Sequence, residues 1–292
     1  MSQVLYDEPG PLARRRIRMW TGVAALVLAL IAGFVVWQLW SRGIFELGRW
    51  EIFARPDVWE ALLVRGLVLG TLKAAGVAAL ISVVGGLLLA VARMSHVKLL
   101  RIPAMVIIEA FRGLPVLLLM LFSALALGLS IFQAVILGLS LYNSAVIGEI
   151  LRAGILSLPK GQKEAALAVG MTQTQALMLV LLPQAIRRMM PSLVSQLVVL
   201  LKDTSLGYIV GYAELLRVSR ELRDFFGGQY LFSIFIVAAA IYITVNFLLS
   251  RLAVVIERRG GKKTAGGAAP AEDAEGGIDP NAPMMHDSGR SV

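Results

Sequence analysis

The feature that most constrains this chain is a series of apolar segments, each long enough to cross a lipid bilayer. A helix needs about 20 apolar residues to span the hydrocarbon layer. Six segments meet this requirement, at about 20–40, 62–92, 103–127, 131–156, 184–201 and 230–256. Hydrophobic residues make up 58% of the 292 residues and charged residues only 16%. The sequence therefore predicts an all-α integral membrane protein with six transmembrane helices.

The basic residues indicate how this bundle lies in the membrane. Lysine and arginine concentrate in cytoplasmic loops of membrane proteins. If six helices alternate in direction, four basic clusters fall on one side, and the opposite loops carry balanced charge. The clusters contain Arg14, Arg15, Arg16 and Arg18; Arg93, Lys98 and Arg101; Arg152, Lys160, Lys163, Arg187 and Arg188; and Arg258, Arg259, Lys262 and Lys263. We therefore expect both termini to be cytoplasmic.

Composition argues against several function classes. The net charge is +9, but the basic residues adjoin apolar segments without interleaved aromatics, so we expect lipid as the partner and no nucleic acid. The chain has no cysteine, and His96 and His286 are far apart in sequence, so we expect no metal site. The stretch GGKKTAGG at 260–267 lacks the spacing of a phosphate-binding loop. We therefore expect no nucleotide site, no cofactor and no enzymatic activity in this chain.

The two ends of the chain differ from its centre. Trp20, Trp37 and Trp40 bracket the first apolar segment, as interfacial aromatic residues do. That segment is too long for the core of a signal peptide and lacks a convincing cleavage site, so we expect it to be retained. Residues 257–292 contain few large apolar side chains, which predicts a disordered tail.

Residues 161–183 form a polar stretch between apolar segments, GQKEAALAVGMTQTQALMLVLLP. The pattern of Glu164, Ala165, Ala166 and Gly170, followed by Val-Leu-Leu-Pro at 180–183, resembles the EAA loop of bacterial ABC importer permeases. Valine stands where that family has isoleucine. Small residues on one helix face would let a rigid partner pack closely, and a glycine would end the helix at a turn. The alternative is an ordinary surface helix in a cytoplasmic loop.

Other segments narrow the resemblance to permeases for polar amino acids. Residues 108–115 resemble the family's E-x-F-R-G-T-P segment, and residues 143–152 resemble its N-S-x-x-x-x-E-I-x-R helix. Residues 182–185 and 201–206 resemble its L-P-Q-A and L-K-D-T-S-L segments. The resemblance covers about residues 62–256 and departs from the family at Leu114 and Val146.

The resemblance implies a five-helix type I ABC importer permease core plus one N-terminal helix. In this division, residues 1–61 hold the cytoplasmic N-terminus, the extra helix and an external loop. Residues 62–256 form the transmembrane domain, with the EAA loop at about 158–183. The implied partners are an ABC ATPase dimer carrying ATP-Mg, an extracytoplasmic solute-binding protein, and a homologous permease subunit or second copy. The resemblance implies that the subunit lies in a bacterial cell membrane and that its cytoplasmic EAA loop contacts the ATPase through Gly161, Glu164, Ala165, Ala166 and Gly170.

Arg112 is the first candidate for a substrate pathway. It lies within an apolar segment, where a charge is costly unless it faces protein or water. Glu109 is three residues earlier on the same helix face, so a structural ion pair between the two is one interpretation. A position beside the translocation pathway is the other.

A second group of candidates lies after the EAA loop. Gln196 and Asp203 are seven residues apart, which places them on one helix face. If that face lines the pathway, an amide and a carboxylate would meet the substrate. Lys202, Asp203, Thr204 and Ser205 interrupt an apolar run, which predicts a broken helix beside a cavity. The alternative is a helix end at which Asp203 or Thr204 caps the next segment.

These observations favour a permease subunit of an ATP-driven, binding-protein-dependent amino acid importer. The candidate face carries only one carboxylate, and Arg112, Arg152 and Lys202 are the nearby cations, so we expect an acidic or amide substrate such as glutamate. An ion-coupled secondary amino acid transporter is the alternative, although no motif occurs twice as internal repeats would require. A membrane scaffold without a pathway is a third interpretation.

Overall fold

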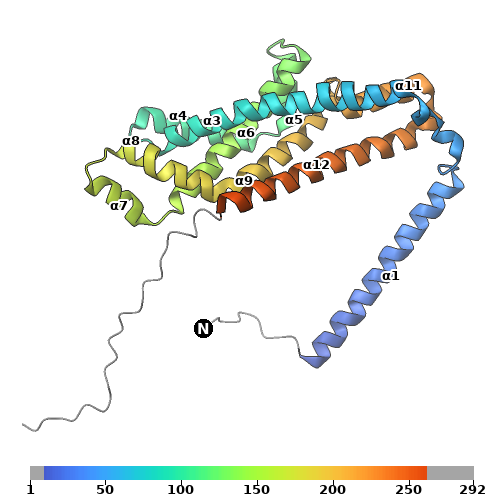
Figure 1. Ribbon diagram of the computed structural model, residues 1–292, viewed down its shortest axis with the longest axis horizontal. Coiled ribbons are helices and arrows are strands. Elements are labelled where there is room, and N and C mark those ends of the chain that lie inside the picture. Colours follow the sequence, from blue (N-terminus) through green and yellow to red (C-terminus); the bar gives the residue numbers. More distant parts are fainter. Residues whose placement is uncertain (1–9, 262–292) are drawn as a thin grey trace, which may run out of the picture.

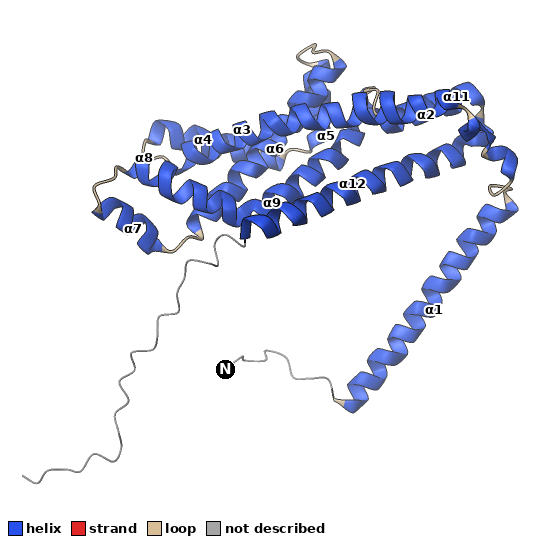
Figure 2. Ribbon diagram, in the orientation of Figure 1, coloured by secondary structure: helices blue, strands red, loops and turns tan. Residues whose placement is uncertain are grey.

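The computed structural model describes residues 10–261 and contains only helices and their connections within that range (Figure 2). Five long helices or helix series are long and apolar enough to cross a membrane, and the bent pair Lys98–Gly113 and Val116–Leu125 makes a sixth when it is counted as one span. The long elements are α1 (Pro11–Ser41), α3 (Lys73–Met94), α4 (Lys98–Gly113), α5 (Val116–Leu125), α6 (Ile131–Leu156), α9 (Leu182–Asp203), α11 (Leu215–Phe226) and α12 (Leu231–Gly261). The prediction of a six-span, all-α membrane protein is confirmed.

Shorter elements connect these helices. They are η1 (Leu47–Arg49), η2 (Glu51–Ala54), α2 (Pro56–Trp59), η3 (Glu60–Leu72), α7 (Lys160–Ala168), α8 (Gln173–Gln175), η4 (Ala176–Leu181), η5 (Thr204–Leu206), α10 (Gly207–Val210) and η6 (Gly228–Tyr230). The segments α2, η3 and α3 follow one another without a break and form one span, Pro56–Met94. The last helix runs to Gly261, so residues 257–261, which we expected to belong to a disordered tail, are helical. The rest of that predicted tail lies outside the described residues.

Helix α6 is the centre of the bundle. It packs against α3, α4, α5 and α9, and it contributes more buried residues than any other helix of the described chain. It packs tightly on α3, where a Cβ added to Gly86 would lie 2.5 Å from the side chain of Ile147. Glycine is therefore required at this crossing, because any larger side chain would push the two helices apart.

The third apolar segment is bent, contrary to the expectation of one continuous span at 103–127. Helices α4 and α5 meet at an angle of 100°. Pro115 has no N–H to donate and forces Leu114 into an extended conformation, with φ −96° and ψ 137°. Hydropathy cannot reveal such a bend, because it reports the composition of a segment and not the direction of the chain.

A second packing centre joins η3 to α11 and α12. The pair Gly66 and Gly70 faces the start of α11, where a Cβ on Gly70 would lie 2.5 Å from the carbonyl oxygen of Ala213. The G-x-x-x-G spacing in this span therefore serves close packing.

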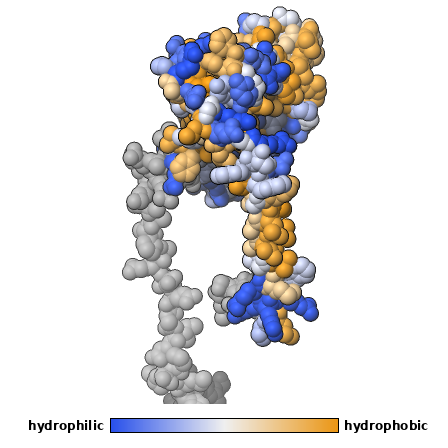
Figure 3. Space-filling model, turned by 90° about the vertical axis from the view of Figure 1, so that its right-hand side faces the viewer, coloured by the Kyte–Doolittle hydropathy of each residue, from blue (hydrophilic) through white to orange (hydrophobic). Residues whose placement is uncertain are grey.

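Helix α1 has no buried residue and leaves the bundle at an angle (Figure 1). Its surface is an apolar stalk that ends in a hydrophilic cluster (Figure 3). That pattern is typical of a helix surrounded by lipid with a basic end at the membrane surface.

Candidate functional site

The EAA-like loop folds as a short helix that ends at glycine. Helix α7 covers Lys160–Ala168, and Gly170 has φ +86°, a left-handed conformation that favours glycine. The N–H of Gly170 donates to the carbonyl of Leu167 at 3.0 Å, and the N–H of Met171 donates to Ala166 at 3.2 Å. The predicted helix and its glycine end are confirmed.

One face of α7 is free for a partner in this structure. Gly161, Glu164, Ala165 and Ala168 are all exposed, and their spacing places them on one side of the helix. A Cβ added to Gly161 would meet no atom within 4 Å. Ala166, which we grouped with these residues, is only 6% exposed and packs toward the bundle. The exposed face therefore presents small side chains and a single carboxylate.

Side-chain contacts hold α7 against the bundle. It packs on η4, and the amide of Gln184 on α9 donates to Gln162 at 3.1 Å. Arg188, also on α9, donates to the carbonyl of Ser157 at 2.9 Å, just after α6 ends. Thr172 and Gln175 form a reciprocal cap that fixes the next turn. These contacts connect α7 to α9, and α9 to the end of α6.

Glu149 on α6 is surrounded by three guanidinium groups. Its carboxylate lies 2.6 Å from Arg152, 3.1 Å from Arg93 and 3.9 Å from Arg112. Glu109 contacts Arg93 at 3.0 Å. The interpretation that Arg112 pairs with Glu109 was therefore wrong, because each residue finds its partner on another helix. The network ties α3, α4 and α6 together.

The predicted pathway face lies on α9. Gln196 is half-buried, and its amide donates to the side-chain oxygen of Asn143 on α6 at 2.9 Å. Asp203 is half-buried in the last turn of the same helix, and no residue in the described part of the chain bonds to its carboxylate. Among the predicted pathway residues, Asp203 is thus the acid left available to a ligand.

The expected break at Thr204 and Ser205 is absent. The chain continues through the η5 turn, where the hydroxyl of Thr204 donates to Leu201 at 2.6 Å and that of Ser205 donates to Lys202 at 2.8 Å. Neither Asp203 nor Thr204 caps the following segment. The helical direction changes later, at Gly211. Local hydroxyl-to-carbonyl bonds allow polar residues to continue a helix within an apolar run.

Glu214 is a buried polar residue that the sequence analysis did not single out. It is 0% exposed and caps α11 by accepting from the N–H groups of Leu216 and Arg217 at 2.9 and 2.8 Å. Tyr242 on α12 donates its hydroxyl to the same carboxylate at 2.7 Å. Burial raises the pKa of Glu214, although these donors oppose the shift. A carboxylate just before the amphipathic run at 215–226 was the available sequence signal.

No group of three metal-ligating side chains occurs among residues 10–261. The geometry instead offers an exposed partner face on α7, a charge network and a polar face on α9. These are features of a membrane subunit that couples to other proteins.

Comparisons with known proteins identify the kind of subunit. The glutamate transport system permease protein GluD of Corynebacterium glutamicum is 42% identical, over 76% of this chain and 83% of that protein. The probable glutamine ABC transporter permease protein GlnP of Bacillus subtilis is 38% identical, over 69% and 93%. The glutamate/aspartate import permease protein GltK of Escherichia coli O157:H7 is 35% identical, over 68% and 92%.

Solved structures agree with these relatives. An amino acid ABC transporter determined with histidines matches with 33% identity and a TM-score of 0.62, over 69% of this chain and 95% of that one. The inward-facing MetNI methionine ABC transporter matches with 27% identity and a TM-score of 0.59, over 70% and 98%. The fold is therefore that of type I importer permeases.

The family match extends over most of the bundle. Residues 82–261 match the family described as binding-protein-dependent transport system inner membrane component. Members of this family are ABC transporter permease subunits, which are not themselves enzymes. This chain belongs to that family and is an ABC importer permease subunit.

Proposed function

We propose that this chain carries an acidic amino acid or its amide, such as glutamate, into a bacterial cell with energy from a partner ATPase. The exposed face of Gly161, Glu164, Ala165 and Ala168 on α7 carries the proposal, because it offers close contact and one charge. Relatives named for glutamate, glutamine and glutamate/aspartate support the substrate class.

The ATPase dimer would bind ATP-Mg and seat α7 in a groove. Movement of α7 would pass to α9 through the Gln184–Gln162 contact and to the end of α6 through the Arg188–Ser157 contact. The bundle would then alternate between two states that bind the substrate differently, which is what moves such an equilibrium.

The remaining assignments follow from the same arrangement. An extracytoplasmic solute-binding protein would deliver substrate, and a second copy or a homologous permease would complete the pathway. Both termini would be cytoplasmic, with residues 62–256 as the transmembrane domain. Gln196, Asp203, Thr204 and Ser205 would lie along the pathway. Arg112, which pairs with Glu149, would lie nearer the end of the bundle that carries α7. Asp203 suits the substrate's ammonium group, because its carboxylate has no partner in the described residues.

The proposal is tested by uptake into proteoliposomes. The chain is reconstituted with its co-purifying ATPase and binding protein, and entry of labelled glutamate is measured with ATP, without ATP, and with an ion gradient alone. We expect uptake only with ATP. Uptake driven by the ion gradient alone would indicate the secondary transporter, and absence of flux in every condition would favour the scaffold.

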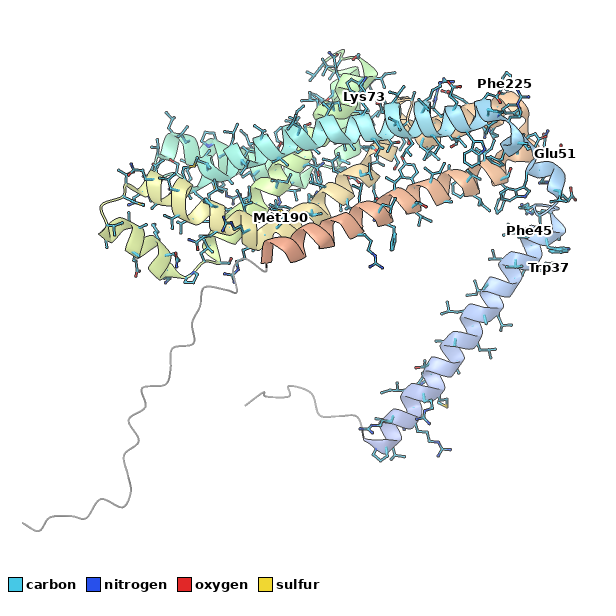
Figure 4. The ribbon with its side chains drawn as sticks, viewed as in Figure 1. Trp37, Phe45, Glu51, Lys73, Met190 and Phe225 are labelled. Atoms are coloured by element: carbon cyan, nitrogen blue, oxygen red, sulfur yellow. The ribbon has the colours of Figure 1, made fainter. Side chains whose placement is uncertain are left out.

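A variant tests the docking surface in the same assay. Glu164→Arg reverses the single charge on the exposed face, so we expect insertion to survive while uptake falls by about tenfold or more, for a loss of ~1.4 kcal/mol. Glu51→Arg, an exposed reversal at the opposite end of the molecule (Figure 4), is the control and should transport normally. Intact uptake and intact ATPase co-purification with Glu164→Arg would refute the docking role.

A further inference from the structure

A pocket of about 480 Å³ is lined by residues of α3, α6, α7, α8 and η4. Helices α7 and α8 lie at one end of the bundle (Figure 1). Its rim is polar and includes His96, Lys160, Lys163 and Thr174. Its floor is apolar and includes Leu177 and Leu181 of η4. The volume falls within the range of pockets that bind small molecules.

The pocket and the exposed face of α7 use different sides of that helix. Lys160 and Lys163 are three residues apart and both line the pocket. Gly161, Glu164 and Ala165 are absent from its lining. An ATPase on the exposed face would therefore leave the pocket open to another ligand.

The charges of the pocket select an anion. No aspartate or glutamate lines it, and neither Lys160 nor Lys163 forms an ion pair within the described chain. Two unpaired ammonium groups beside one cavity favour a ligand with a negatively charged group.

The position of the pocket at the ends of two membrane spans favours an amphiphilic ligand. Met94 and Leu156, which line it, are the last residues of two membrane spans, so the rim lies at the membrane surface. The floor continues from there toward the interior of the span, with Val91 one turn before Met94 in α3. A ligand that fits both parts has an anionic head and an apolar chain.

We propose that this pocket binds an anionic phospholipid of the leaflet beside α7, with its phosphate on Lys160 and Lys163 and the start of an acyl chain on the apolar floor. Basic pockets between helices at the membrane surface commonly hold such headgroups. Because both lysines belong to α7, the bound lipid fixes the position of that helix. The proposal depends on the cytoplasmic orientation given above but not on the substrate.

Lipid titration followed by native mass spectrometry of the purified full-length chain tests the proposal. Phosphatidylglycerol and phosphatidylcholine with the same acyl chains are compared on wild type and on Lys160→Gln/Lys163→Gln. We expect one phosphatidylglycerol to bind preferentially, and the double variant to weaken its binding about 30-fold, from about fivefold for each lysine. Equal binding of the two lipids to wild type would overturn the proposal.

A matched variant separates this site from general electrostatic attraction. Arg15→Gln/Arg16→Gln removes two exposed charges from the basic end of α1, away from the pocket. We expect it to retain the preferential binding, because its arginines do not line the pocket. A loss equal to that of the lysine variant would show that only net charge matters.

The apolar floor needs its own probe. Ala92→Phe fills the pocket from α3 and leaves both lysines in place. This variant should bind phosphatidylglycerol about tenfold more weakly than wild type, a loss of ~1.4 kcal/mol. We expect inorganic phosphate to compete only weakly with the lipid, in wild type and in the variant alike. Thermal unfolding confirms that the variant is folded. If inorganic phosphate displaces the lipid at millimolar concentration, or if Ala92→Phe binds lipid normally, the site binds a simple anion and the lipid assignment is wrong.

Discussion

Glu149 balances the charges of three helices. Its side chain is only 19% exposed, and it faces Arg93 of α3, Arg112 of α4 and Arg152 of α6. A guanidinium group has no neutral form at physiological pH, so the cost of losing this carboxylate falls on the arginines. Arg152 makes the closest contact with it, at 2.6 Å, whereas Arg93 would keep Glu109 as a second partner at 3.0 Å.

We expect Glu149→Gln to lower the free energy of unfolding by about 1–3 kcal/mol, less than for a fully buried ion pair because the network is partly solvated. Thermal unfolding in detergent measures the change. Glu221→Gln is the control, since Glu221 is 46% exposed in its pair with Arg217 and should change stability by about 0–1 kcal/mol. Similar losses in both variants would contradict a special role for the Glu149 network.

Gln196 offers a test of the pathway face. Gln196→Glu would add a second carboxylate seven residues before Asp203 on α9, which favours a cationic substrate. We expect arginine to compete with glutamate uptake at least about tenfold better than in wild type, which corresponds to ~1.4 kcal/mol. Unchanged competition by both amino acids, with normal expression of the variant, would remove Gln196 from the pathway.

The sequence predicted that Arg112 needs a partner but not which one. Spacing within one helix offered Glu109 as the partner. In the structure, Glu109 forms an ion pair with Arg93, and Arg112 forms one with Glu149. Contacts between helices depend on how the helices are rotated, and a single sequence does not contain that information. Glu214 was overlooked for the same reason, since it is packed against Gly70 of η3 and bonded by Tyr242 of α12.

Among the helices whose side chains the structure describes, α11 is the one capped by a fully buried acid. Burial raises the pKa of Glu214 above its ordinary value. The folded protein therefore binds this proton more tightly than the unfolded chain, so acidification toward the unfolded pKa adds stability, and stability is lost as pH rises through the folded pKa. Glu214→Gln cannot titrate and should lose this dependence.

Thermal unfolding at several pH values between about 5 and 8 measures the effect. We expect wild type to gain stability relative to Glu214→Gln as the pH falls. Asp224→Asn, an exposed change on the same helix, should keep the wild-type slope. Parallel pH profiles for wild type and Glu214→Gln would show that the carboxyl does not titrate in this range.

Helix α7 depends on the conformation of Gly170. Gly170→Ala must adopt φ +86° with a Cβ, which costs about 1–2 kcal/mol. We expect amide hydrogen exchange in residues 160–170 to accelerate about 5- to 30-fold. Gly161→Ala lies in the same helix with open space around it, so its exchange should remain unchanged or slow slightly. Equal acceleration in both variants would mean that the glycine conformation does not hold the loop.

Helix boundaries were more predictable than helix paths. The segment at 131–156 coincides with α6, because its apolar run begins after the Ser130 cap and ends beside polar residues. The bend between α4 and α5 was not predicted, although Pro115 was visible in the sequence. A proline shows where a helix ends but not the direction in which the chain continues.

The two ends of the bundle differ in their charge. Glu51 lies at one end of the molecule (Figure 4), while α7 and α8 lie at the other (Figure 1). Basic residues gather at the α7 end, and balanced charges occupy the opposite loops. The energy of placing positive charge on the cytoplasmic side therefore predicts one orientation for the whole bundle.

The absence of cysteine allows a direct test of this orientation. Gly48→Cys and Val169→Cys each place one thiol at an exposed position at opposite ends of the molecule. A membrane-impermeant maleimide applied to intact cells should label Gly48→Cys and not Val169→Cys, whereas both should react after the membrane is opened. Labelling of Val169→Cys in intact cells would place α7 outside, where no ATPase could reach it, and both the coupling mechanism and the inner-leaflet lipid site would fail together.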